Sequence, residues 1–155
     1  MKMAAASTTA AIAVLKDKLQ LSMELAELER AFLHSSFIGE HPECGESNER
    51  LEFLGDAVIE LAVREYLFKR FPQENEGVLT QKKAALVSDV RLAKQAQVLG
   101  LNQCLFLGKG TDETGGRTIP SILAAAFEAL AGLVFLHEGY PRAKQLVCEH
   151  LNLTA

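Results

Sequence analysis

Four acids recur at helical spacing in the segment NERLEFLGDAVIE, residues 48–60. At about 100° per residue, Glu49, Glu52, Asp56 and Glu60 fall on one side of a helix. Glu52 and Asp56 are four residues apart, so their side chains converge. Oxygen ligands of this kind suit Mg²⁺ or Mn²⁺, and one interpretation is a set of metal ligands. The other is a solvated acidic face near a helix start, where the macrodipole favours carboxylates.

A further acid, Glu128, favours the metal-site interpretation. It lies in SILAAAFEALAG, residues 121–132, where alanine and glycine predict that neighbouring helices approach closely and leave little water. An ionised Glu in such surroundings is costly unless it is paired or bound to a cation. No Lys or Arg lies within a helical turn of it. If carboxylates from the two helices bind one cation, this explains both the row of acids in residues 48–60 and the acid at Glu128 among small residues.

The elements that must position these acids are helices. Apolar residues recur at three- and four-residue steps along the chain, and alternating β-branched runs are absent. We predict an all-α bundle of six or more helices, with residues 1–10 as a flexible tail and residues 11–155 as one domain. The expected helices are Ala11–Leu19, Glu24–Leu33, Asn48–Phe71, a segment from Val78 or Thr80 to Gly100 that breaks near Val87 or Ser88, a helix opened by Pro120, and Pro141–His150.

The long acidic helix is expected to begin with Asn48 as its N-cap and to stop at Pro72. Its main core face is predicted to comprise Leu51, Leu54, Val58, Leu61 and Ala62. Val63 and Leu67 extend the opposite, acidic side, so this helix is expected to be buried on two faces near its end.

The bulk composition limits the classes of function. The 155 residues carry a net charge of −4, which argues against nucleic-acid binding by general electrostatic attraction alone. Three widely spaced cysteines and four histidines show no zinc-binding pattern, and a reducing compartment is expected. The uncharged stretch over residues 3–15 is too short to span a bilayer, so we expect a cytoplasmic protein with no membrane partner.

Three other motifs are weaker indicators of function. His34 stands beside Ser35 and Ser36, but no GxSxG elbow accompanies them, and we interpret His34 as a local hydrogen-bonding group. GKGT, residues 108–111, lacks the spacing of a phosphate-binding loop. A modest basic cluster, interpreted as solvated surface, comprises Lys82, Lys83, Arg91 and Lys94.

With these residues in view, the chain closely resembles the ribonuclease III endonuclease domain from about Leu28 to Leu146. NERLEFLGDAV looks like the signature of that family, and AFLHSSF, NEGVLTQKKAALVS, GGRTIPSILA and FEALAGLVFLHEGY are similar to its other motifs. The resemblance implies metal-dependent hydrolysis of phosphodiester bonds in double-stranded RNA. Glu52 and Asp56 match the catalytic acids of the signature helix, and Glu128 matches an acid of the later helix. Mg²⁺ or Mn²⁺ is the implied cofactor.

Further site residues follow only from this resemblance. Glu49 and Glu76 match accessory acids that line the RNA cleft. Phe53 matches an aromatic residue that the family inserts into a socket of the partner subunit, which implies a homodimer with two active sites.

Two departures from the family pattern affect the expected activity. The family usually has an Asp three residues before Glu128, and this chain has Ala125 there. The chain is then a pseudo-enzyme, has an altered site, or uses a neighbouring group instead. No double-stranded-RNA-binding domain follows the last expected helix, so weak and salt-sensitive RNA affinity is expected. The alternative function is a non-catalytic RNA-binding or ribosome-associated structural module.

Overall fold

The computed structural model describes residues 2–153, with side chains from residue 6 onward, and this part of the chain is helical. The helices are α1 (Lys2–Leu19), α2 (Leu25–Glu29), α3 (Ser35–Glu40), α4 (Glu49–Arg70), α5 (Glu76–Leu86), α6 (Asp89–Leu99), α7 (Leu101–Cys104), α8 (Lys109–Glu113) and α9 (Pro120–His150). Short 3₁₀ turns cover residues 30–32, 42–44 and 116–118. The only β-type pairing among the described residues is an isolated bridge between Leu33 and Phe106. The predicted all-α class is confirmed.

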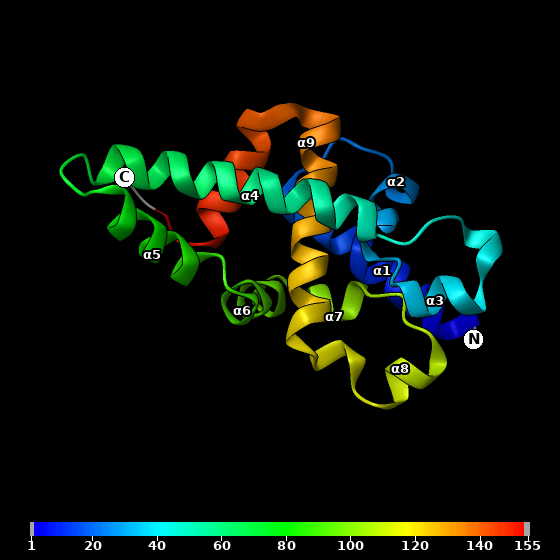
Figure 1. The fold of residues 1–155 in the computed structure, drawn as a ribbon. Coiled ribbons are helices and arrows are strands. Elements are labelled where there is room, and N and C mark those ends of the chain that lie inside the picture. Colours follow the sequence, from blue (N-terminus) through cyan, green and yellow to red (C-terminus); the bar gives the residue numbers. More distant parts are fainter. Residues whose placement is uncertain (1, 154–155) are drawn as a thin grey trace.

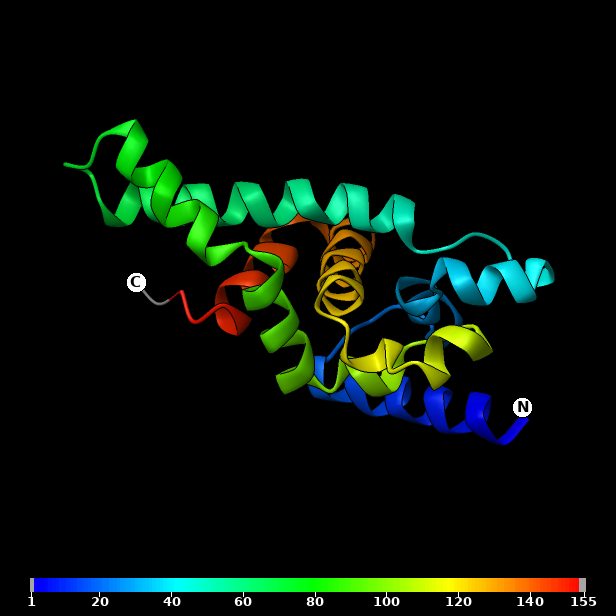
Figure 2. The same ribbon diagram turned by 60° about the horizontal axis from the view of Figure 1, so that its bottom comes forward.

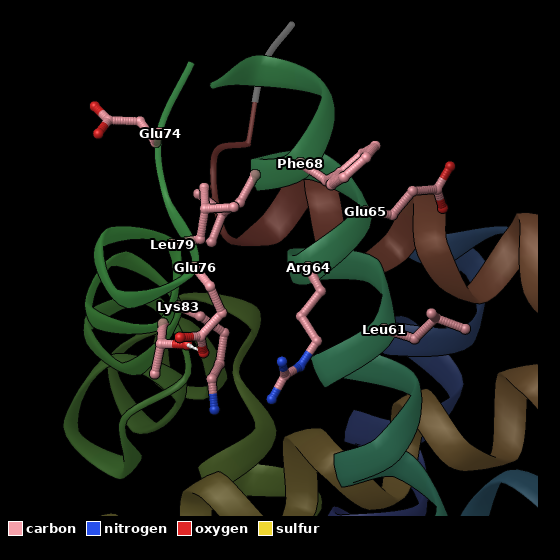
Figure 3. A pocket seen from close by; sticks show the side chains of 10 residues that line it. Leu61, Arg64, Glu65, Phe68, Glu74, Glu76, Leu79 and Lys83 are labelled. Atoms are coloured by element: carbon pink, nitrogen blue, oxygen red, sulfur yellow. Dashed lines mark hydrogen bonds between the residues drawn. The ribbon is translucent and has the colours of Figure 1, made fainter. Parts of the chain in front are cut away.

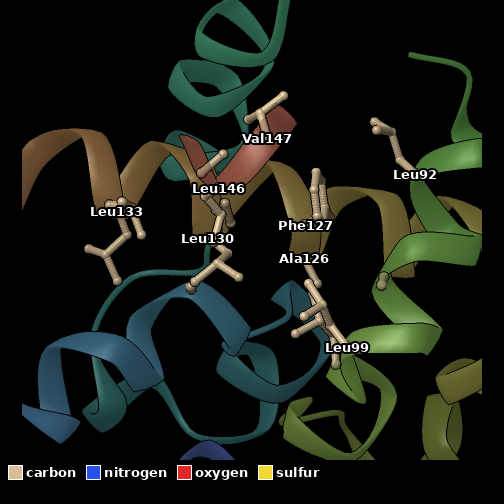
Figure 4. Packing of buried hydrophobic residues seen from close by; sticks show 14 of the residues in the cluster. Leu92, Leu99, Ala126, Phe127, Leu130, Leu133, Leu146 and Val147 are labelled. Atoms are coloured by element: carbon tan, nitrogen blue, oxygen red, sulfur yellow. The ribbon is translucent and has the colours of Figure 1, made fainter. Parts of the chain in front are cut away.

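Helix α9 forms the centre of the molecule. It crosses α4 on one side and lies above α1 on the other, while α6 flanks it (Figures 1 and 2). Its composition is apolar enough to cross a bilayer, but 56% of its most apolar window is buried against the other helices. Figure 4 shows Phe127 and Leu130 of α9 in the core with Leu92 and Leu99 of α6. Burial of this helix on several sides accounts for its composition.

Local sequence signals set most helix ends as expected. Helix α4 stops just before Pro72, and Ser88 caps α6 by accepting a hydrogen bond from the backbone N–H of Arg91. Gly100 closes α6 in the left-handed region, with a φ of 79° that favours glycine. Pro120 occupies the first turn of α9, where its missing N–H is not needed.

Several expected boundaries differ. The first helix begins at Lys2 rather than Ala11, and the segments predicted as loops contain α3 and α8. The expected division before Pro141 is present, however, because Gly139 has non-helical backbone angles, with a φ of 81°, and two helices meet there at a kink within α9. Asn48 precedes α4 but does not cap it, because its buried side chain donates to the carbonyl of Ala31 instead.

The core face of α4 also needs one correction. Leu51, Val58 and Ala62 are buried as predicted, whereas Leu54 is half-buried and Leu61 is 54% exposed. Val63 and Leu67, on the side assigned to the acids, are buried, as expected for a helix covered on two faces near its end. The neighbours α9 and α5 meet α4 from different directions, and a single helical period does not contain that information.

Candidate active site

The site begins with an unusually close crossing of α4 and α9. A Cβ built on Gly55 of α4 would lie 1.7 Å from the carbonyl oxygen of Glu128 in α9. A Cβ on Gly132 of α9 would lie 2.4 Å from the carbonyl oxygen of Leu51. Both positions therefore require glycine, since any side chain would push the backbones apart. The small residues around Glu128 do permit the close approach that the sequence predicted.

This crossing brings carboxylates from three helices to one hollow of about 490 Å³. The lining residues, which we call the acidic pocket, are Glu49, Glu52, Phe53, Asp56, Asp89 and Glu128. Glu52 and Asp56 come from α4, Asp89 from the first position of α6, and Glu128 from the first third of α9. The structure thus brings together the three acids that were identified as metal ligands from the sequence.

These acids have no basic partners. Among the described side chains, no Lys, Arg or His forms an ion pair with Glu52, Asp56, Asp89 or Glu128. Glu60, one turn further along α4, does not line this pocket and pairs with Lys83 at 2.6 Å and with Arg64 at 2.8 Å. The acidic pocket therefore holds acids that no basic side chain among the described residues compensates through an ion pair.

Burial, together with repulsion between the acids, raises the pKa of two of them. Burial, followed by repulsion from Asp56, Glu52 and Asp89, raises the pKa of Glu128 to about 8. Burial and the neighbouring acids Glu49, Asp89 and Asp56 also raise the pKa of Glu52. A bound cation would reverse both shifts, because it stabilises the ionised carboxylates.

The donor set suits a hard divalent cation in chemistry and charge. Within the described residues, however, no three Asp, Glu, His or Cys side chains already lie close enough to hold an ion. Repulsion between unpaired carboxylates favours such separation. The acids therefore surround a space that a cation could occupy, but they would have to move closer together to coordinate it.

Asp89 is the functional candidate that the sequence interpretation missed. In the sequence it follows Ser88, so it fits an ordinary acid in the first turn of a helix. Its position opposite Glu128 arises from the packing of α6 against α9, which local spacing does not encode.

Ala125 lies in a smaller hollow of about 180 Å³ next to the acidic pocket. Its lining residues, which we call the side pocket, are His34, Ser35, Asn48, Glu49, Glu52, Ser121, Ile122 and Ala125. Glu49 and Glu52 line both hollows, so they form the wall between them. An acid at position 125 would therefore approach the acidic pocket from the Glu52 side.

The accessory acids are placed differently from each other. Glu49 is exposed at the edge of the acidic pocket, where it accepts a hydrogen bond from Ser47. Glu76 does not join the acidic pocket of the same chain. It accepts a hydrogen bond from Thr80 and lines a separate hollow between α4 and α5.

That separate hollow has a volume of about 660 Å³ and a largely apolar lining (Figure 3). We call it the α4–α5 pocket; it is lined by Leu61, Arg64, Glu65, Leu67, Phe68, Glu74, Glu76, Leu79, Thr80 and Lys83. Phe53, which lines the acidic pocket, is 83% exposed, and Phe68 is 74% exposed. The outer face of α4 thus carries large apolar side chains that the described part of the chain leaves exposed.

Comparison with known proteins identifies the family. A model described as ribonuclease-III-like matches residues 25–153. Ribonuclease 3 of Pelotomaculum thermopropionicum is 50% identical over 125 residues, which cover 80% of this chain and 52% of the relative. Ribonuclease 3 of Natranaerobius thermophilus is 46% identical over 138 residues, covering 89% and 60%. The chain spans about half the length of the curated relatives it matches.

Solved structures agree with this match. The nuclease domain of ribonuclease III from Campylobacter jejuni superposes with a TM-score of 0.83 at 37% identity, covering 89% of this chain and 94% of that domain. A second structure of the same domain superposes with a TM-score of 0.81. The matched segment includes the whole acidic pocket, and the chain belongs to the ribonuclease III family.

Proposed function

We propose that this chain is a metal-dependent endonuclease that hydrolyses phosphodiester bonds in double-stranded RNA. The observation that carries this proposal is the acidic pocket, where carboxylates from α4, α6 and α9 meet without basic partners among the described residues. Its family supports the reaction type, since the similar curated proteins are named Ribonuclease 3. Recognition of an A-form duplex by its shape suits a protein with a net charge of −4.

The cation ligands in this proposal are Glu52, Asp56 and Glu128. Bound Mg²⁺ or Mn²⁺ would stabilise charge that develops on the scissile phosphate and would activate water. The protein's own contribution is to hold ionised carboxylates in a half-buried pocket and to orient them from rigid helices. Glu128 must lose its proton to act as a ligand, so cation affinity is expected to rise with pH up to about 8.

Ala125 is expected to make cleavage slow. An acid there would add a ligand from the Glu52 side, and its absence weakens both cation affinity and the alignment of water with phosphate. Folding should be unaffected, because alanine is the best helix former and Ala125 is only partly buried in α9.

The direct test is incubation with long duplex RNA in Mg²⁺, Mn²⁺ or EDTA, for the unmodified chain and for Ala125→Asp. We expect slow cleavage that EDTA abolishes, and a faster rate at lower Mg²⁺ for Ala125→Asp. Each tenfold gain corresponds to about 1.4 kcal/mol of transition-state stabilisation. Cleavage that persists in EDTA would contradict the metal role, and an unchanged rate in the Asp variant would contradict the role of Ala125.

The second candidate function is binding of duplex RNA without cleavage, by a chain with the same fold. The observation that favours it is Ala125 itself, which removes one acid from the usual set of the family. In that case the chain binds duplex RNA and cleaves none, even at saturating Mn²⁺. The same incubation separates the two functions, provided that binding is measured in parallel.

We also propose that the chain forms a homodimer through the outer face of α4. Phe53 and Arg64 are eleven residues apart, about three helical turns, so Phe53 and the α4 side of the α4–α5 pocket share one face. An apolar hollow of this size has room for an aromatic ring, and a two-fold partner would offer Phe53 of the partner subunit to it. The Campylobacter jejuni nuclease domain is described as having a region involved in dimer formation.

Sedimentation of the unmodified chain and of Phe53→Ala tests the dimer. Loss of an aromatic ring that is buried between subunits costs roughly 3–5 kcal/mol, so the variant should dissociate at low concentration. Val98→Ala, which removes a 66% exposed side chain from α6, is the matched control and should remain dimeric. A monomeric unmodified chain would contradict the proposal.

A further inference from the structure

The side pocket contains a histidine with a defined hydrogen-bonding role. Nδ1 of His34 accepts the backbone N–H of Ser36 at 3.2 Å and lies 2.8 Å from the Ser36 hydroxyl. That hydroxyl oxygen already accepts the backbone N–H of Gly108 at 2.9 Å, so its own proton is free to point at His34. Two donors facing Nδ1 make it an acceptor, and the imidazole proton is therefore carried by Nε2.

The backbone around His34 is fixed to the elements that carry the acids. Its N–H donates to the carbonyl of Phe106 at 3.1 Å. The preceding carbonyl, that of Leu33, accepts the N–H of Asn48 at 2.8 Å, and the Asn48 side chain donates to Ala31 at 2.9 Å. Since Asn48 immediately precedes α4, the imidazole is held in a set position relative to Glu49 and Glu52.

The side pocket therefore presents both donors and acceptors. Its lining side chains offer the Nε2–H of His34 and the hydroxyls of Ser35 and Ser121 as donors, and the carboxylates of Glu49 and Glu52 as anionic acceptors. A phosphate group would meet two carboxylates there and be repelled. A hydroxyl group both donates and accepts hydrogen bonds, and it fits a hollow of about 180 Å³ beside the acidic pocket.

We propose that the side pocket binds a ribose 2′-hydroxyl of the duplex, with the Nε2–H of His34 donating to the hydroxyl oxygen and the Glu49 carboxylate accepting its proton. His34 is then a specificity residue that distinguishes RNA from DNA close to the scissile phosphate. This inference rests on the proposed function, since it places duplex RNA against the acidic pocket.

The test couples a protein variant to a substrate change. His34→Asn keeps a side-chain oxygen that can accept the Ser36 N–H, since Asn is a favoured N-cap, but it removes the Nε2–H donor. Binding of a short RNA duplex is measured by fluorescence anisotropy in Ca²⁺. A series of duplexes is used, each with a single 2′-deoxy substitution at a different position of one strand. For the unmodified chain, one position should weaken binding by roughly threefold to tenfold, the range of one hydrogen bond.

For His34→Asn we expect that all-RNA binding weakens by the same factor and that the 2′-deoxy change at that position has no further effect. A residue with a merely structural role would leave the 2′-deoxy penalty in place. His137→Asn, the same change at a histidine near Glu27 on the far part of α9, is the control and should keep the full penalty. If His34→Asn fails to fold, Glu49→Ala, which removes the proposed acceptor of the hydroxyl proton, provides the second variant and should reduce the same penalty.

The experiment distinguishes failure of this inference from failure of the proposed function. A 2′-deoxy penalty that persists undiminished in both variants, or its absence at every position in the unmodified chain, overturns the role of His34 while duplex binding remains. A chain that binds no duplex RNA overturns the proposed function and this inference with it.

Discussion

The two halves of α4 treat their acids in opposite ways. In the second half, Glu65 forms ion pairs with Lys144, at 2.8 Å, and with Lys69. It also accepts a hydrogen bond from the Tyr140 hydroxyl at 2.9 Å. Hydrogen bonds from Lys144, Lys69 and Tyr140 lower the pKa of Glu65 to about 2. In the first half, Glu52 and Asp56 face Glu128 and have no such partners among the described residues, and the pKa of Glu128 rises to about 8.

The difference shows that unpaired charge is a local property of this site. The chain has the basic residues and the geometry to compensate acids along the same helix, as Lys83 and Arg64 do for Glu60. Leaving the acidic pocket uncompensated destabilises the empty protein. A compensating cation from outside would remove that cost, which is the physical reason to propose the first half of α4 as part of the active site.

The largest expected effect comes from disturbing the crossing that creates the pocket. Gly55→Ala places a methyl group against the backbone of α9, 1.7 Å from the Glu128 carbonyl oxygen. We expect a loss of about 3 kcal/mol or more in the free energy of unfolding, at the upper end for overpacking. Gly39→Ala in α3, where a Cβ meets nothing within 4 Å, is the control. Urea denaturation of both variants measures this, and equal stability would contradict the close crossing.

A smaller effect is expected from breaking the compensation in the second half of α4. Burial pushes the pKa of Glu60 up, but hydrogen bonds from Lys83 and Arg64 outweigh it and lower the pKa. Lys83→Met leaves only Arg64, and we expect a loss of roughly 1–2 kcal/mol of stability. Lys94→Met, at an exposed lysine without an ion pair, should change little. No difference between the two variants would show that pairing there is unimportant.

The last pair of variants should show effects of opposite sign in the two halves of α4. The pKa of Glu128 is raised on folding, so its ionisation destabilises the folded state as pH rises from about 4.5 to about 8. In EDTA, Glu128→Gln should therefore melt higher than the unmodified chain at pH 8 and nearly equally at pH 4.5. The difference should be roughly 2–4 °C for each 1 kcal/mol of relieved repulsion.

Glu65→Gln is the matched variant. The pKa of Glu65 is lowered on folding, so its contribution is present above about pH 4.5 and is lost as pH falls through about 2. This variant should melt lower at pH 8, and the deficit should shrink in acid. The same sign for both variants would remove the contrast between the two halves of α4.

Much of the fold could be predicted because it depends on local signals. Pro72, Gly100 and Pro120 end or begin helices for reasons that act within a turn of the chain. The convergence of Glu52 with Glu128 could also be inferred, because the small residues around Glu128 predict close helix packing. Those signals are present in the printed sequence.

What could not be predicted depends on contacts distant in sequence. Asp89 reaches the acidic pocket only because α6 packs against α9, and Leu61 is exposed because no helix within residues 2–153 covers that side of α4. Asn48 was expected to cap α4, but the carbonyl of Ala31 provides a buried partner for its side chain. Tertiary contacts override local preference at each of these positions.

The most direct test of the central claim is a crystal structure of the chain grown or soaked with Mn²⁺, with anomalous diffraction data collected to locate the ion. We predict an anomalous peak among Glu52, Asp56 and Glu128, and none at Glu60 or Glu65. An acidic pocket without a peak at millimolar Mn²⁺, or a peak at the paired acids instead, would contradict the account.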